Sequence, residues 1–371
     1  MSLKIIRLFY CFALPFIFLG ATSAVSEENP IKIAAMIHIT GEYAEAGSAF
    51  LEGLTLAEEE IAAQGKVKGR SIKVIIDDTR YDMKLVNTLS HKALSVDNAV
   101  LGLISNYTEV MVAGPVFERA RIPLITLWDS SPEIEALGEY VFGIGVWTPS
   151  SSQVSAEYAL NKIGAETAVT IANNGQWSIA VADSFEKNFS AGGGRVLKKF
   201  VVNPQDTDFR TLIAQIVRLN PDLVYAPLSD NPLAFWKQLG TSAYRGARIS
   251  SDTITQEIVN QLGEVANGIL TTQLIDPSGL RTDHMLHLYR EKFKRECTQL
   301  FLVGLGYDAL HLAVEALRRA ESLSGPDIAR AIYSLRDFPG AAGEISVTPQ
   351  GSVIKPASMF VVRNGRLTAL E

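Results

Sequence analysis

Cysteine is nearly absent from this sequence, which has two among its 371 residues, Cys11 and Cys297. Cys11 lies in an apolar stretch at the N-terminus, so a chain that loses this stretch keeps one thiol and cannot form an internal disulfide. A disulfide scaffold is therefore excluded. Cys297 stands near the end of the helical pattern "REKFKRECTQ", where we expect a half-buried structural thiol rather than a nucleophile.

Long hydrophobic runs are also missing, apart from one over residues 8–19. Lys4 and Arg7 precede this run and small residues follow it up to Ala24, which is the pattern of a secretory signal cut after Ala24. The run is short for a membrane span of about 20 residues. We therefore expect residues 1–24 to be a cleaved signal peptide and the remaining chain not to insert into a membrane. A retained membrane anchor is the alternative.

Basic residues are fewer than acidic ones, with 34 Lys and Arg against 40 Asp and Glu and a net charge of −6. Loss of residues 1–24 removes two basic residues, Lys4 and Arg7, and no acidic one, so the charge falls from −6 to −8. An acidic chain lacks the basic face that nucleic acids require. We expect no nucleic-acid partner.

Catalytic motifs are not evident either. There is no Gly-x-Ser-x-Gly elbow, and the polar groups contain no evident nucleophile–base pair. The stretch Gly304–Ala309 fits a dinucleotide fingerprint formally, but no acidic residue follows at the required distance. His284 and His287 could share a helix face, but no third metal ligand accompanies them. We expect no enzyme, no cofactor and no metal.

What the sequence does contain is a regular alternation of short β-branched runs and amphipathic helices, which predicts an α/β protein of two doubly wound parallel-sheet lobes. In the first half we expect strands at 31–39, 71–78, 100–105 and 122–126 and helices at 46–64, 85–95 and 111–121. The pattern restarts after residue 147, with strands at 168–173, 195–202, 222–228 and 247–252 and helices at 179–191, 209–220 and 232–243. The chain closes on an antiparallel stretch with turns at 349–351 and 364–365.

Polar and aromatic residues gather where these strands end, and ligands of open parallel sheets bind at that edge. The groups are His38, Thr40, Tyr43 and Gly47; Asn106, Tyr107 and Thr108; Trp128, Asp129 and Ser130; Asn173, Asn174, Gln176 and Trp177; Ser229, Asp230 and Asn231; and Ser250, Ser251, Asp252 and Thr253. Each polar residue alone could be a helix N-cap. The two indoles cannot be caps, so the whole set predicts a site for a small molecule.

Four stretches of the sequence carry a family resemblance. They are "TGEYAEAGSAFLEGLTLAEEEIAAQGKVKGRSIKVIIDDTRYD", "VFERARIPLIT", "GYDALHLAVEAL" and "FPGAAGEISVTPQG". The chain after residue 24 resembles the periplasmic leucine/isoleucine/valine-type substrate-binding proteins of ABC transporters. This resemblance implies the type I periplasmic binding fold, with a hinge of three crossovers near residues 147, 275 and 335. Lobe 1 would comprise 31–146 and 276–334, and lobe 2 would comprise 147–275 and 335–371.

The resemblance also implies a role. The protein would be a monomeric periplasmic receptor that closes on a small organic ligand, either amino-acid-like, an amide or an aromatic compound, and delivers it to an ABC-type permease. The alternative is a ligand-sensing or accessory protein of a periplasmic signalling or dehydrogenase system that uses the same cleft.

The family's ligand contacts can be carried over by alignment. The residues that grip the α-carboxylate fall on Asn106 or Tyr107, next to Thr108, and on Trp128-Asp129-Ser130. In lobe 2 the aromatic contact falls on Trp177, the tyrosine on Ser229 with Asp230 beside it, and the ammonium acceptor on Asp252. Tyr43, from the end of the first strand, completes the predicted set.

Asp129 departs from the family pattern, because a second carboxylate a few ångströms away would be repelled by several kcal/mol in a desolvated cleft, on the order expected at an effective dielectric near 20. Trp128 likewise fills space that small residues leave open. The resulting hypothesis is a ligand that is neutral, cationic or aromatic and is stacked between Trp128 and Trp177.

Overall fold

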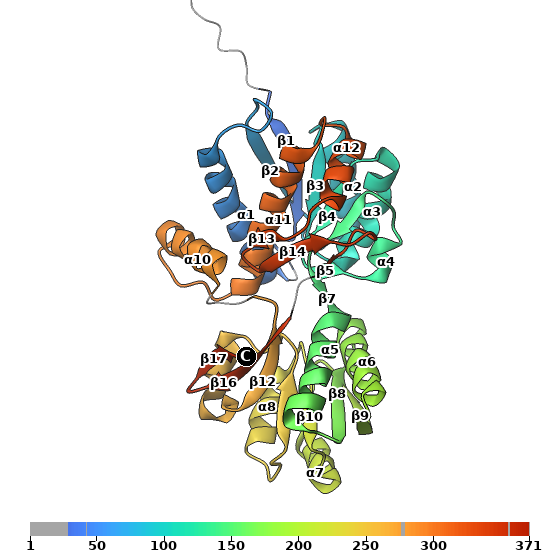
Figure 1. The fold of residues 1–371 in the computed structure, drawn as a ribbon, viewed down its shortest axis with the longest axis vertical. Coiled ribbons are helices and arrows are strands. Elements are labelled where there is room, and N and C mark those ends of the chain that lie inside the picture. The colour runs from blue at the N-terminus through green and yellow to red at the C-terminus, as the bar shows by residue number, and fades with distance from the viewer. Residues whose placement is uncertain (1–28, 42, 276–278, 355–356, 371) are drawn as a thin grey trace, which may run out of the picture.

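The computed structural model describes residues 29–370 except 42, 276–278 and 355–356, and it consists of two lobes (Figure 1). The sheet of lobe 1 has the order β2-β1-β3-β4-β6, and all its neighbouring strands are parallel. Its strands are β1 (Ile31–Ile37), β2 (Ile72–Asp78), β3 (Leu101–Ile104), β4 (Leu124–Thr126) and β6 (Val141–Gly143).

Helices cover both faces of this sheet, because its strands are apolar on both sides. One core cluster joins the sheet to α1 (Ala44–Gln64), α10 (Leu280–Phe293), α11 (Leu300–Arg319) and α12 (Gly325–Tyr333). The other face packs on α2 (Met83–Ser95), α3 (Tyr107–Ala120) and α4 (Pro132–Glu135). Helix α11 is long and apolar enough to cross a membrane, but 78% of its apolar window is buried inside the protein, as in the core helix of a folded domain.

Lobe 2 is built on a sheet of order β17-β16-β12-β11-β10-β8-β9. Its strands are β8 (Thr167–Asn173), β9 (Arg195–Val202), β10 (Leu223–Tyr225), β11 (Ala247–Ser250), β12 (Ile269–Gln273), β16 (Ser358–Arg363) and β17 (Arg366–Ala369). Its helices are α5 (Thr148–Tyr158), η1 (Ala159–Ile163), α6 (Gln176–Ala191), α7 (Arg210–Leu219), α8 (Pro232–Gly240), α9 (Gln256–Leu262) and η2 (Gly263–Ala266). Strands β8 to β12 are parallel, and β16 and β17 add an antiparallel hairpin at one edge. The fold class predicted from the sequence is confirmed.

The hairpin turn lies at the predicted Asn364-Gly365, where both residues have positive φ angles of 50° and 73°. These angles match the turn type whose twist suits a two-residue hairpin, and Asn-Gly is its preferred sequence.

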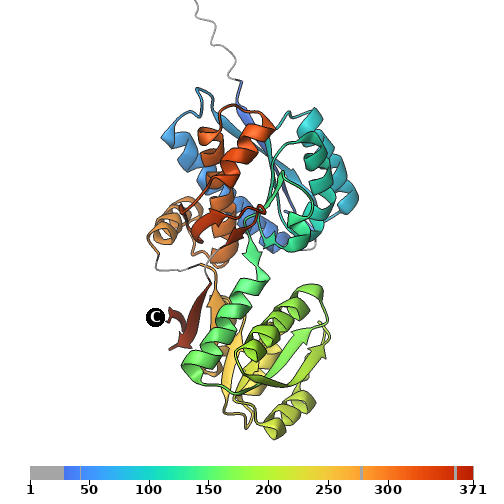
Figure 2. The ribbon, with the colours of Figure 1, turned by 45° about the vertical axis from the view of Figure 1, so that its right-hand side comes forward.

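Three segments connect the lobes (Figure 2). The first runs from β6 through β7 (Val146–Trp147) into α5, the second from β12 towards α10, and the third from β15 (Val353–Ile354) to β16. The predicted third crossover near residue 335 is wrong. Strands β13 (Phe338–Gly340), β14 (Gly343–Val347) and β15 form a small sheet of their own, and its residues Phe338, Ile345, Val347 and Val353 pack in the core of lobe 1. Residues 335–354 therefore belong with lobe 1.

The crossovers also fix which edges of the two sheets face each other. Strand β6 leads directly towards lobe 2, and every strand of its sheet runs parallel to it. Strand β12 leads back towards lobe 1 and is parallel to β8, β10 and β11. The carboxyl ends of both parallel sheets therefore point towards the other lobe, and the residues that follow these strands lie between the lobes (Figures 1 and 2).

Candidate ligand-binding site

The strand order of lobe 1 reverses between β1 and β3, which is the point where ligands bind in open α/β sheets. His38 follows β1, and Ser105 and Asn106 follow β3. The backbone N–H of His38 donates to Ser105 Oγ at 3.2 Å, and Ser105 Oγ donates to the Met36 carbonyl at 3.3 Å. The two strand ends are thus joined at the reversal.

The N-terminus of α3 lies at this reversal and is already occupied by the protein's own side chains. Asn106 is the N-cap, and its side-chain oxygen accepts from the Glu109 N–H at 3.2 Å. Asp129 Oδ2 accepts from the Tyr107 N–H at 2.7 Å. Burial raises the pKa of Asp129 to about 6, although this hydrogen bond lowers it in part. An anionic carboxylate near neutral pH is favoured at a helix N-terminus.

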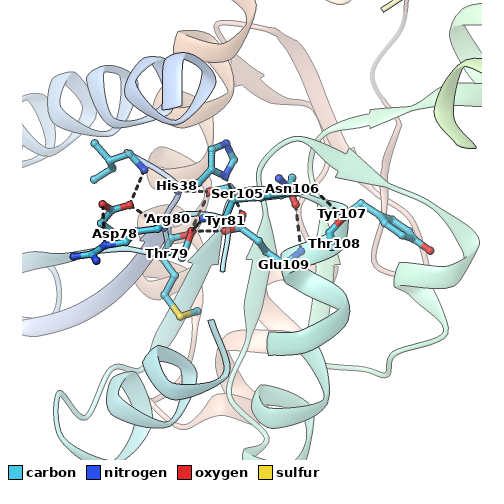
Figure 3. A network of polar contacts seen from close by, with 12 residues as sticks. His38, Asp78, Thr79, Arg80, Tyr81, Ser105, Asn106, Tyr107, Thr108 and Glu109 are labelled. Atoms are coloured by element: carbon cyan, nitrogen blue, oxygen red, sulfur yellow. Dashed lines mark hydrogen bonds and ion pairs between the residues drawn. The ribbon is translucent and has the colours of Figure 1, made fainter. Parts of the chain in front are cut away.

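Tyr107 and Thr108 differ in the direction of their side chains. Thr108 Oγ1 accepts from the Tyr81 hydroxyl at 3.2 Å. The phenol ring of Tyr107 points away from His38 (Figure 3) and packs on the α2–α3 side of the sheet. The structure therefore places the backbone of Tyr107 at the strand reversal, and its ring elsewhere.

Asp78 organises the loops that follow β1 and β2. Its Oδ1 accepts from the backbone N–H groups of Ile39 and Thr40 at 3.0 and 3.2 Å. It also accepts from the backbone N–H of Arg80 at 3.0 Å (Figure 3). Burial alone would raise the pKa of Asp78, but the Thr40 hydroxyl and these N–H groups hold it below its usual value. The ionised carboxylate therefore fixes both loops at about neutral pH.

Trp128 and Ser130 both follow β4, but their side chains contact different parts of the protein. Trp128 is half-buried, with its ring edge-to-face on Phe50 at 5.5 Å and stacked on His38 at 6.5 Å between centroids. Ser130 is buried in β5 (Asp129–Ser130), which pairs with β7 of the first crossover, and its hydroxyl lies 3.5 Å from the Gly145 carbonyl. Ser130 thus contacts the first crossover between the lobes.

Lobe 2 has its own strand reversal, between β8 and β10. Asn173, at the end of β8, is buried, and its side-chain oxygen accepts from the backbone N–H groups of Ser229 and Asp230 at 2.9 and 3.2 Å. Its amide donates to Asn231 at 2.9 Å. This bonding holds the loop after β10 so that the side chains of Ser229 and Asp230 are exposed, with the Ser229 hydroxyl 2.8 Å from Asp230 Oδ2.

Asp252 and Trp177 complete the predicted set on lobe 2. Asp252 follows β11, and burial raises its pKa to about 6. Its Oδ1 is buried and has no hydrogen-bond partner among the described residues. Trp177, near the start of α6, packs half-buried on the core. Among the ring contacts of the described residues, Trp128 meets His38 and Phe50, and none joins it to Trp177 of the other lobe.

Sequence reasoning missed a buried network beneath the lobe 1 loops. His38, Thr79 and Glu109 have no exposed surface, and their side chains are hydrogen-bonded together (Figure 3). Thr79 and Glu109 did not stand out, because a residue at the end of β2 and one on α3 give no joint signal along the chain. The available signal was a histidine that directly follows a buried strand at the first strand reversal.

Within the described part of the chain no group of three His, Cys, Asp or Glu side chains could hold a metal ion. The side chains at the two facing edges are instead amides, hydroxyls, carboxylates and aromatic rings. Such an arrangement can hold a small organic molecule by hydrogen bonds and ring contacts.

Two parallel-sheet lobes that face each other across three crossovers define a class of two-lobed binding proteins. The chain belongs to the periplasmic binding protein family, which matches residues 30–366. The Leu/Ile/Val-binding protein of Escherichia coli K12 is 24% identical over 218 residues, which are 58% of this chain and 57% of the relative. The chain thus matches little more than half the length of these relatives.

One other relative and one solved structure of similar fold are matched over most of their length. The Leu/Ile/Val-binding protein homolog 3 of Brucella melitensis is 25% identical over 349 residues, covering 92% of this chain and 94% of the relative. Among solved structures, a solute-binding protein of an ABC transporter from R. palustris, in complex with benzoate, superimposes with a TM-score of 0.76 at 21% identity. That match covers 92% of this chain and 95% of the other. The family resemblance seen in the sequence is confirmed.

Proposed function

We propose that this protein is a periplasmic solute-binding receptor that closes on a small organic ligand and passes it to an ABC-type permease. The observation that carries this proposal is the facing of the two carboxyl sheet edges, each with a strand reversal lined by polar and aromatic side chains. A ligand that contacts both edges does so only when the lobes are closed. It therefore shifts the open–closed equilibrium by its differential affinity for the closed form.

The ligand does not use a carboxylate to hold the N-terminus of α3. In related amino-acid receptors, the resemblance implies that a ligand carboxylate binds at this place. Here the Tyr107 N–H already donates to the Asp129 carboxylate at 2.7 Å. A second carboxylate would compete for this donor and would be repelled by Asp129 at about neutral pH.

A neutral, cationic or aromatic ligand fits these contacts better, and Trp128 and Trp177 are the rings that would stack on it when the lobes close. The benzoate complex of the R. palustris protein supports the aromatic ring of the proposed solute only, because benzoate carries a carboxylate that Asp129 disfavours here. Asn106, Thr108, Tyr43, Ser229, Asp230 and Asp252 are the proposed polar and aromatic partners around it.

The proposed function is tested first by native mass spectrometry of the protein purified from its own host. We expect a co-purifying small molecule, a single protein chain per particle and a mature N-terminus after Ala24. A chain that retains residues 1–24 in a membrane fraction would contradict cleavage after Ala24.

Calorimetric titration then tests the ligand class. We expect Trp128→Ala to weaken binding of the co-purified compound about tenfold or more, because ring stacking contributes about 0.5–1.5 kcal/mol beyond buried area. The control is Phe200→Ala, which removes a half-buried ring on β9 of lobe 2. Tight leucine binding that is unchanged in Trp128→Ala would refute the proposed ligand class.

A further inference from the structure

The buried network at the lobe 1 strand reversal leaves one polar atom without a partner. His38 Nδ1 lies 3.0 Å from Glu109 Oε2, and the Thr79 hydroxyl donates to the other carboxylate oxygen, Oε1. His38, Thr79 and Glu109 are all fully buried. His38 Nε2 is buried as well, and it has no hydrogen-bond partner within the described residues. An unsatisfied buried polar group of this kind costs about 1–3 kcal/mol.

The carboxylate fixes the orientation of the imidazole. Glu109 Oε1 accepts from the Thr79 hydroxyl, and Glu109 Oε2 lies 3.0 Å from His38 Nδ1. This contact is satisfied by the tautomer that carries its proton on Nδ1, which leaves Nε2 facing away from Glu109. Helix α1 lies close against His38, since a Cβ at Gly47 would lie 1.9 Å from the His38 carbonyl oxygen and 3.0 Å from its Cδ2. The position of Nε2 is therefore set before any ligand arrives.

Four aromatic rings from three segments of the chain surround the His38 ring. The centroids of Tyr43, Phe50, Tyr81 and Trp128 lie 6.4, 6.1, 6.0 and 6.5 Å from it. Tyr43 is 50% exposed, and its ring meets Tyr81 edge-to-face at 5.0 Å. Phe50 is fully buried, whereas Tyr43, Tyr81 and Trp128 are at least partly exposed, so three of the four rings around His38 reach the surface.

The backbone beneath these rings is strained. Tyr43 and Tyr81 have φ angles of 64° and 58°, and the neighbouring Arg80 has 55°. Non-glycine residues rarely adopt such angles, and they concentrate at binding sites when the surrounding contacts hold them there. The Tyr81 hydroxyl is held by Thr108, as described above.

We propose that His38 Nε2 hydrogen-bonds a hydroxyl group of the bound solute, whose flat apolar body lies against Tyr43, Tyr81 and Trp128. A hydroxyl accepts from Nε2–H of a charged ring and donates to the lone pair of a neutral one, so it satisfies His38 in either protonation state. Glu109 acts through His38 as a positioning residue. This assignment names the solute class, a hydroxylated aromatic compound, and it rests on the proposed receptor function.

The test uses two variants of His38, each of which replaces only one of the two ring nitrogens by an amide. His38→Asn keeps an amide near Nδ1 for Glu109 but removes the atom at Nε2, whereas His38→Gln places an amide near Nε2. The probes are benzyl alcohol and 4-hydroxybenzyl alcohol, with benzamide, benzoate and leucine as compounds that lack a hydroxyl on the ring or its methylene group. Binding is measured by calorimetry, and folding is measured by thermal melting.

We expect the two alcohols to bind the wild-type protein. His38→Asn should lose about 10- to 100-fold in affinity, as hydrogen-bond energies of about 1–3 kcal/mol imply, without a lower melting temperature. His38→Gln should retain most of the binding. In the wild-type protein, benzyl alcohol should shift the ¹⁵N resonance of His38 Nε2. Unchanged affinity in His38→Asn, or an unchanged resonance at saturation, would overturn the assignment even if a variant misfolds.

The outcomes also separate the two proposals. Binding of leucine, benzoate or benzamide without binding of either alcohol overturns the hydroxyl assignment and leaves the receptor in place. Binding of none of the five, together with no co-purifying molecule, overturns the receptor function itself.

Discussion

Replacing Asp129 by asparagine should make the protein more stable, and more so at neutral than at acidic pH. Burial raises the pKa of Asp129 from near 3.8 to about 6. The folded protein therefore holds this proton more tightly than the unfolded chain. Between these two pKa values the folded state binds more protons, so stability falls as the pH rises. Asparagine keeps an oxygen for the Tyr107 N–H but cannot ionise.

The size of the effect follows from the shift. A difference of about two pKa units corresponds to about 3 kcal/mol once the pH exceeds both values. At about pH 4.5 roughly 1 kcal/mol of this penalty is present, so roughly 2 kcal/mol develops between there and about pH 7. Because the Asp129 residue is only half-buried, solvent screening lowers the expected difference to about 1–2 kcal/mol.

Urea unfolding of wild-type protein and Asp129→Asn at both pH values measures this difference. The variant's gain in the free energy of unfolding should grow by about 1–2 kcal/mol from about pH 4.5 to about pH 7. Asp208→Asn is the control, because Arg210 hydrogen-bonds exposed Asp208 and lowers its pKa to about 2, below this window. An equal gain for Asp129→Asn at both pH values would refute the reasoning.

Three further predictions concern packing and reactivity. Gly47→Ala should destabilise the protein by about 1–3 kcal/mol, because its Cβ would lie 1.9 Å from the His38 carbonyl oxygen. Gly175→Ala should not destabilise it, because a Cβ there would have nothing within 4 Å, and equal melting temperatures for the two variants would contradict the prediction. Asp308→Ala should lower the free energy of unfolding in urea by about 2–4 kcal/mol. Buried Asp308 accepts from the Ala341 and Ala342 N–H groups at 2.6 and 2.9 Å and so holds the β13–β14 turn on α11. A decrease below about 0.5 kcal/mol would argue against placing this segment with lobe 1. Cys297 should react slowly with iodoacetamide at about pH 8 until the chain unfolds, because burial raises the pKa of its thiol to about 12. Equal reaction rates in the folded and the unfolded protein would show an accessible thiolate and contradict this prediction.

The positions of the strand ends could be predicted from the local sequence pattern. Alternating β-branched runs and amphipathic helices predict parallel sheets, and parallel sheets predict ligand groups at their carboxyl edges. In the structure Asn173 is the last residue of a strand, and Asn106, Trp128, Ser229 and Asp252 follow strands of the two sheets. Their positions along the chain were accessible because a strand's end is a local property.

The third crossover shows where that reasoning stops. Residues 338–354 alternate like strands of any sheet, and nothing local tells which lobe they join. The decision comes from Asp308, which accepts from the N–H groups of Ala341 and Ala342, and from Phe338 and Ile345, which pack in the core of lobe 1. These partners lie far enough away in the sequence that pattern alone cannot pair them.

The sequence by itself determined the fold class, the family and the edge of each sheet that carries polar groups, because periodicity and turn residues act over a few positions. Only the tertiary structure decided the direction of each side chain at those edges. Asp129 turns to the Tyr107 N–H, Ser130 turns to the hinge, and His38 turns to Glu109, 71 residues along the chain. A hydrogen bond is fixed by the position of both partners in space, and that position exists only once the chain has folded.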